Sequence, residues 1–152
     1  MSGPTSKNSP DIVRAMNLQQ TLTHWKQVRA GLLSAIQKFN DDDLAFKPFS
    51  TSWPAGQIVL HIAEAEDGWF RYTVMHGLEK WPEGYTLAKY PSCDSITAAL
   101  GAVHSRTEQY LVSITNYETD QLITVPWGEN LPLHWIIRHV LEHEIHHRGE
   151  LS

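Results

Sequence analysis

The feature that most constrains the fold is a histidine-rich segment near the C-terminus. Residues 131–151 contain no proline after Pro132, and their apolar residues recur three and four positions apart, which predicts a single helix. Four of the nine histidines fall within nine consecutive residues of this segment. Residues four apart lie on one face of a helix, so His139, His143 and His147 form a ladder.

Such a ladder can bind a metal ion, because two imidazoles one turn apart can occupy two positions of one divalent ion, with nitrogens at about 2.0–2.1 Å. At about 100° per residue, His147 and His143 lie nearest the apolar stripe, while His139 and His146 tend toward solvent or a partner. We therefore predict that His143 and His147 are metal ligands. The stripe is made of Leu133, Ile136, Ile137, Val140, Leu141 and Leu151.

Glu144 lies near the middle of the same apolar stripe. A buried carboxylate is costly unless a cation or hydrogen bonds satisfy it, so this position predicts a charged group in the interior. His143 to His147 also spell His-Glu-x-x-His, the zincin metalloprotease pattern, in which Glu144 would be the general base. Glu144 is therefore a candidate catalytic residue. The protease interpretation is the weaker alternative, because the chain is short for a protease with a substrate cleft.

The composition describes one ordinary globular domain. With 152 residues, 41% hydrophobic and 19% charged, we expect a single domain over residues 1–152, loose at 1–10. The net charge of −5 and the lack of a basic patch argue against nucleic acid as a partner. The single cysteine, Cys93, fits a reducing cytoplasm. No signal peptide or membrane-spanning run is recognisable, so we expect a cytoplasmic protein without a membrane partner.

Helical periodicity recurs in three further segments. Asp11, Ser52 and Asp94 are the expected N-caps, and Gly77 is the expected residue after the second helix. The segments are 11–39, 53–76 and 94–115, followed by the histidine segment 131–151. Between them lie an aromatic-rich loop, 77–93, and a β-prone stretch, 122–128, where we expect a short extended element. Together these segments predict an all-α protein, a four-helix bundle with long crossover loops.

The third metal ligand must come from another helix, because bundles build metal sites from side chains of facing helices. His61 lies mid-helix at the edge of an apolar face, whereas His76 and His104 lie near an end or on a more polar side. His61 is therefore the predicted third ligand. Three protein ligands plus an open position are typical of a catalytic site.

A fourth protein ligand would instead indicate a closed, structural metal site. Glu66, His139 and the loop 77–93 are the candidates for that position. The second helix also carries apolar residues on two sides, which predicts either a central position in the bundle or burial by a second subunit.

Two stretches of the chain, Trp53 to Glu66 and His139 to Leu151, resemble the DinB superfamily. The most specific element is the His-x-x-x-His-Arg-Gly motif that ends at Gly149, paired with an upstream histidine; Glu150 stands where a glutamine is common. The resemblance implies an up-down-down-up four-helix bundle, often dimeric. It also implies a divalent metal, frequently zinc or nickel, held by His61, His143 and His147.

The resemblance also suggests a chemistry, because some members are thiol-dependent S-transferases or isomerases that use bacillithiol, mycothiol or glutathione. An open metal position can bind and deprotonate such a low-molecular-weight thiol, or it can activate water for hydrolysis. We therefore expect a metal-dependent thiol transferase or hydrolase that acts on a small molecule and forms a homodimer. The alternative is a non-catalytic, stress-related metal-binding dimer.

Overall fold

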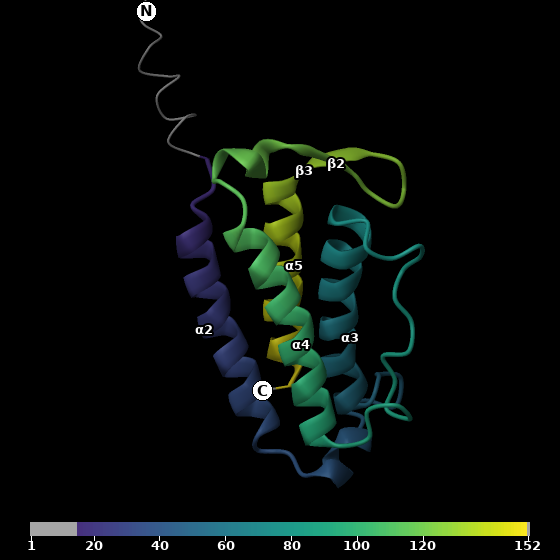
Figure 1. Cartoon of the computed structure of the whole chain (residues 1–152). Coiled ribbons are helices and arrows are strands. Elements are labelled where there is room, and N and C mark those ends of the chain that lie inside the picture. The colour runs from purple at the N-terminus through teal and green to yellow at the C-terminus, as the bar shows by residue number, and fades with distance from the viewer. Residues whose placement is uncertain (1–14, 152) are drawn as a thin grey trace, which may run out of the picture.

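The computed structural model describes residues 15–151 and shows four long helices side by side (Figure 1). They are α2 (Leu18–Ile36), α3 (Ala55–Asp67), α4 (Cys93–Val112) and α5 (Leu133–Glu150), and a π-helical segment, η2 (Gly68–Val74), continues α3. The all-α four-helix bundle predicted from the sequence is confirmed. Short elements join the helices: η1 (Asp41–Ala45), η3 (Tyr117–Asp120), β2 (Leu122–Thr124) and β3 (Asn130–Pro132).

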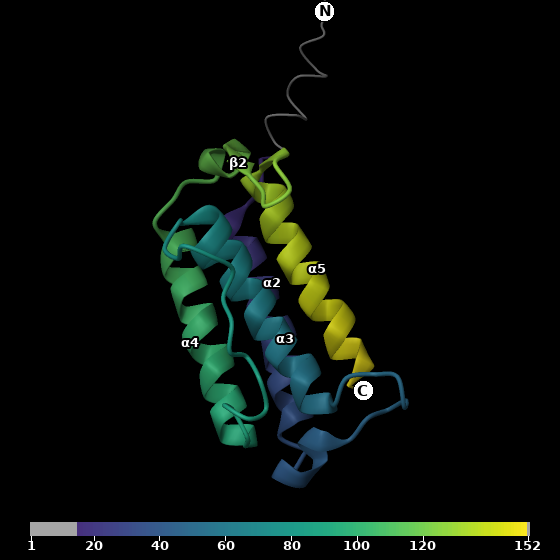
Figure 2. The ribbon, with the colours of Figure 1, turned by 90° about the vertical axis from the view of Figure 1, so that its right-hand side faces the viewer.

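The helices follow the up-down-down-up order. The chain runs in one direction along α2 and α5 and in the opposite direction along α3 and α4, as the colours of Figures 1 and 2 show. Because α3 and α4 are parallel, the crossover loop (75–92) has to return along the whole length of the bundle. α3 packs against α4 and α5, and α2 packs against the same two helices, so α2 and α3 are diagonal neighbours.

α3 is the most buried helix, with ten of its thirteen residues buried. Its neighbours are α4, α5 and η1, while Trp81 of the crossover loop lies against Gly68 at its end and Leu87 lies against Gly56 at its start. Both apolar sides of this helix are therefore covered within one chain. A second subunit is not needed to explain them.

The helix boundaries differ from the expected ones at the N-caps. Asn17 caps α2 through a hydrogen bond of 3.0 Å from a backbone N–H of the first turn; the expected cap, Asp11, lies outside the described residues. Ser52 does not cap α3, because its hydroxyl donates to the carbonyl oxygen of Phe49 at 2.8 Å. Pro54 takes the cap position instead, without a side-chain cap.

Two further boundaries move by one or two residues. Ser92 caps α4 in a reciprocal capping box with Ser95, so Asp94 lies in the first turn. After η2, the left-handed backbone conformation falls on His76, with φ of 55°, and not on Gly77.

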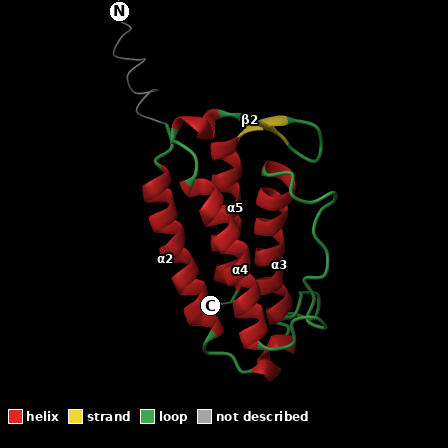
Figure 3. Cartoon of the chain, in the orientation of Figure 1, coloured by secondary structure: helices red, strands yellow, loops and turns green. Residues whose placement is uncertain are grey.

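The β-prone stretch forms one arm of a small hairpin over the end of the bundle (Figure 3). β2 and β3 pair antiparallel, with Ile123 opposite Leu131, and Gly128 supplies the turn with φ of 94°. The extended element was predicted from the sequence, but its partner strand was not. Three residues that end in Pro132 show no alternation by which a strand could be recognised.

The core consists of two clusters of buried apolar side chains, one toward the hairpin and one toward the opposite end. The first includes Trp25, Phe70 and Ile136, and the second includes Leu32, Leu60 and Leu100. None of the described helices is both long and apolar enough to cross a membrane.

Gly68 tests whether the crossover loop is held to the bundle. A Cβ at this position would lie 2.2–2.4 Å from atoms of the Trp81 indole, so we expect Gly68→Ala to displace the ring and reduce the free energy of unfolding by about 1–3 kcal/mol. Urea unfolding measures the change. Gly101→Ala is the matched control, because nothing lies within 4 Å of its added methyl group; it should stabilise α4 by about 0.5–1 kcal/mol. Equal effects would contradict this packing.

Candidate metal centre

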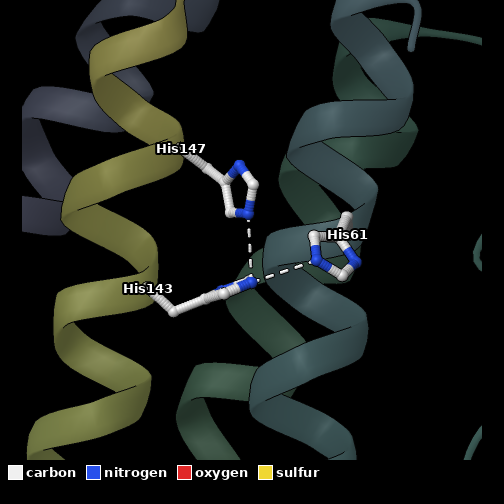
Figure 4. A group of neighbouring side chains, drawn as sticks. All are labelled: His61, His143 and His147. Atoms are coloured by element: carbon white, nitrogen blue, oxygen red, sulfur yellow. Dashed lines mark hydrogen bonds between the residues drawn. The ribbon is translucent and has the colours of Figure 1, made fainter. Parts of the chain in front are cut away.

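The three predicted histidines meet between α3 and α5. His61 projects from α3 and His143 and His147 from successive turns of α5, and all three rings point toward one another (Figure 4). The Nε2 atom of His143 lies 3.0 Å from Nε2 of His61 and 3.1 Å from Nε2 of His147. The side chains of His61 and His147 are 25% and 16% exposed, so the group is accessible from outside.

The three nitrogens fit a metal ion better than they fit one another. A ring nitrogen carries either one hydrogen or one lone pair, so Nε2 of His143 can form only one of its two short contacts as a hydrogen bond. A cation accepts all three lone pairs at once. A tetrahedral zinc ion with nitrogens at about 2.0–2.1 Å keeps them about 3.3–3.4 Å apart, close to the spacing observed between these histidines.

The electrostatics favour neutral imidazoles. Burial and the neighbouring His147 and His61 lower the pKa of His143 to about 3. Burial, followed by the nearby His147, also lowers the pKa of His61. Metal ions bind the deprotonated ring, so the site requires little proton release near neutral pH.

Carboxylates lie close to the Nδ1 atoms of two of the rings, on the side away from the shared Nε2 atoms. Oε1 of Glu64 lies 3.6 Å from Nδ1 of His61, and Oε1 of Glu150 contacts Nδ1 of His147. Glu64 in turn accepts a hydrogen bond of 3.0 Å from the indole N–H of Trp81. A carboxylate on the distal nitrogen fixes the tautomer and the orientation of a metal-binding histidine.

Sequence reasoning missed these carboxylates, although a signal was present. Each glutamate follows its histidine by three residues on a helix, which places the two side chains on one face.

The fourth-ligand candidates have other partners. The carboxylate of Glu66 is fully buried against Arg29 and His104, and the His139 ring stacks on Trp135 with centroids 4.7 Å apart. Among the described residues, no fourth histidine, cysteine, aspartate or glutamate joins the three histidines. A metal ion held by these three histidines would therefore have a coordination position free for water or substrate.

Glu144 lies elsewhere. It is 1% exposed and faces the bundle interior, where Oε1 accepts hydrogen bonds from the indole of Trp25 at 3.0 Å and from Arg29 at 2.9 Å. Its Oε2 accepts a second bond from Arg29 at 2.9 Å. The structure thus supplies the cation that a buried carboxylate requires. It offers no support for Glu144 as a general base, because both oxygens are engaged away from the histidines.

Arg29 connects all four helices. From α2 it reaches Glu144 on α5, Glu66 on α3 at 2.7 Å and the carbonyl oxygen of Leu100 on α4 at 3.0 Å. Burial alone would raise the pKa of Glu66, but the hydrogen bond with His104 and the charge of Arg29 hold that pKa below its ordinary value. Sequence reasoning missed Arg29. A signal was available, because Arg29 lies on the apolar face of its own helix. A buried cation there could have been matched with Glu144, the carboxylate on the apolar stripe of another helix.

Two comparisons with known proteins agree with this architecture. A profile of the DinB superfamily matches residues 24–151, and no curated protein matches the chain. A solved DinB-like protein from Bacillus cereus is similar, with a TM-score of 0.71, 20% identity and coverage of 88% of this chain and 87% of that one.

Two further solved structures carry descriptions of function. YfiT from Bacillus subtilis, described as a probable metal-dependent hydrolase with an unusual four-helix bundle topology, has a TM-score of 0.67 at 20% identity, with coverage of 91% and 89%. A mycothiol-dependent maleylpyruvate isomerase has a TM-score of 0.54 at 11% identity, over 90% of this chain and 61% of that one. At these identities the similarity shows the fold.

Removal of the Arg29 side chain should strongly reduce the stability of the fold. Arg29→Met leaves Glu144 and Glu66 buried without their cation, so we expect the free energy of unfolding to fall by about 3–5 kcal/mol. Urea unfolding followed by circular dichroism measures it. The control is Lys26→Met, an exposed cation on the same helix, which should change stability by about 0.5 kcal/mol or less. A similar loss in both variants would contradict the role of Arg29.

The depressed pKa of His143 predicts acid sensitivity of the metal-free protein. Below its ordinary pKa, near 6.5, His143 gains a proton in the unfolded chain, but in the folded chain it does so only near pH 3. The folded state therefore binds fewer protons in this window, and the free energy of unfolding decreases as the pH falls through it. Thermal unfolding of chelator-treated protein at a series of pH values checks this. His143→Gln should flatten the slope; an unchanged slope would count against the assignment.

Proposed function

The chain belongs to the DinB superfamily, and on that premise we propose that His61, His143 and His147 bind a divalent metal ion that activates a small-molecule substrate. One observation carries this proposal. Three Nε2 atoms face a common point between α3 and α5, and no fourth ligand from the described residues closes the set. Three protein ligands with one open position characterise catalytic zinc sites.

The donors suit zinc or nickel, because imidazole nitrogen is a good ligand for both. When bound, such an ion is a Lewis acid that lowers the pKa of a thiol or water ligand. The protein contributes the rest: Glu64 and Glu150 orient the rings of His61 and His147, and burial lowers the pKa of His61 and of His143 and so favours their neutral forms.

We propose that the reaction is thiol transfer or hydrolysis, since both begin with deprotonation of a ligand at the open position. A low-molecular-weight thiol would be the cosubstrate in the first case. The descriptions of two structural neighbours, one a probable metal-dependent hydrolase and the other a mycothiol-dependent isomerase, support this range of chemistry. The contacts of Glu144 argue against a zincin-type mechanism. That mechanism needs the glutamate of the His-Glu-x-x-His pattern beside the metal, whereas Trp25 and Arg29 bind Glu144 in the interior.

A non-catalytic metal-binding dimer is the second candidate. A closed site would favour it, but Glu66 and His139 are engaged elsewhere, and no described residue of the loop 77–93 joins the three histidines. The open position therefore favours catalysis.

Metal content tests the site directly. Elemental analysis of tag-free protein should find about one zinc or nickel per chain in the wild type and a large loss in His61→Ala, because two histidines of one helix bind such an ion far more weakly than three. His24→Ala, which removes an exposed histidine of α2, should retain the metal. Thiol-transfer and ester-hydrolysis assays then compare loaded with chelated protein. Equal metal in wild type and His61→Ala would refute the site, and equal rates with and without metal would refute catalysis.

A further inference from the structure

Three large aromatic rings are exposed in one short loop between η1 and α3. Phe46, Phe49 and Trp53 are 63%, 72% and 50% exposed. The residues from 46 to 53 form what we call the aromatic loop. Single exposed apolar residues are common, but a group of them within eight residues marks a binding surface.

The aromatic loop is a compact turn that holds its rings outward. Its two ends are joined by a hydrogen bond of 2.8 Å from the N–H of Ala55 to the carbonyl oxygen of Phe46. Within it, the N–H of Ser52 donates to the carbonyl oxygen of Phe49 at 3.0 Å, and the N–H of Phe49 donates to the hydroxyl of Ser52 at 3.2 Å. These hydrogen bonds close the loop on itself, while its aromatic side chains stay exposed.

The loop adjoins the metal centre. The Trp53 ring lies edge to face against the His61 ring, with centroids 4.8 Å apart and planes at 76°. The loop stands at the end of the bundle where α3 begins and α5 ends (Figures 1 and 2). A molecule bound at the open position and extending toward this end of the bundle would therefore lie beside Trp53.

We infer that the aromatic loop is the substrate-binding wall of the metal centre and that it receives a planar aromatic group of the molecule bound to the metal. This inference rests on the proposed function. Offset or edge-to-face contacts between aromatic rings are favourable beyond simple burial, and Trp53 offers half of its surface for such a contact.

The charges beside the site narrow the substrate class further. Glu64 and Glu150 flank the histidines and would offset the charge of a divalent ion bound there, which leaves little net positive charge to attract a ligand that carries several negative charges. The substrate class is therefore a small neutral or singly charged molecule with one metal-binding group and one aromatic ring. Phe46 and Phe49 would extend the apolar surface for a longer molecule.

Two hydroxamates that differ only in the ring provide the test. Acetohydroxamate and benzohydroxamate share a metal-binding group, and only the second has a phenyl ring for Trp53. For zinc-loaded wild type, isothermal titration calorimetry should show benzohydroxamate binding about tenfold more tightly, which corresponds to one aromatic contact. Trp53→Ala should reduce this preference to about twofold or less, and Trp53→Phe should keep most of it.

Trp127→Ala is the matched control, because it removes another exposed indole, 60% accessible, on the hairpin at the opposite end of the bundle. It should leave the preference unchanged. Equal affinity for both hydroxamates in the wild type, or the same preference in Trp53→Ala, would overturn this inference while the metal centre stands. A wild-type dimer that becomes monomeric in Trp53→Ala, seen by sedimentation, would overturn it too, since a second copy would then cover the loop. Binding of neither hydroxamate to zinc-loaded protein would overturn the proposed function, and this inference with it.

Discussion

The structure depends on the buried ion network centred on Arg29. A guanidinium that contacts α3, α4 and α5 from α2 satisfies two carboxylates that could not remain ionised alone in the interior. These contacts are directional, whereas the apolar side chains around them are not. The network therefore sets how each helix is rotated about its own axis, which a purely apolar core would leave less strictly defined.

This rotation decides where the histidines of α5 point. Relative to Glu144, His143 lies about 100° to one side of α5, and His147 lies about 60° to the same side, at about 100° per residue. When Arg29 and Trp25 hold Glu144 in the interior, both histidines are turned to the flank that faces α3. The buried charges thus help to set the orientation of His143 and His147 without contacting them.

A second chain of contacts ties the metal centre to the crossover loop. Glu64 connects the His61 ring to the indole of Trp81, and the absence of a side chain at Gly68 lets that indole lie against the helix. The long return path required by parallel α3 and α4 therefore reaches the surroundings of the three histidines. It supplies a hydrogen-bond donor, the indole of Trp81, to the carboxylate beside His61.

The sequence by itself determined the four helices, the shared flank of His143 and His147 on the last helix, the position of His61 at the edge of an apolar face and the need for a partner to Glu144. All of these follow from the position of a residue around the axis of its own helix, which the spacing of apolar residues reveals. Only the tertiary structure decided that Arg29 is that partner, that both oxygens of Glu144 are engaged away from the three histidines, and that Trp53 stands exposed next to His61. The contact between Arg29 and Glu144 joins residues 115 positions apart in the chain. Spacing within one helix carries no information about which residues of another helix it will meet.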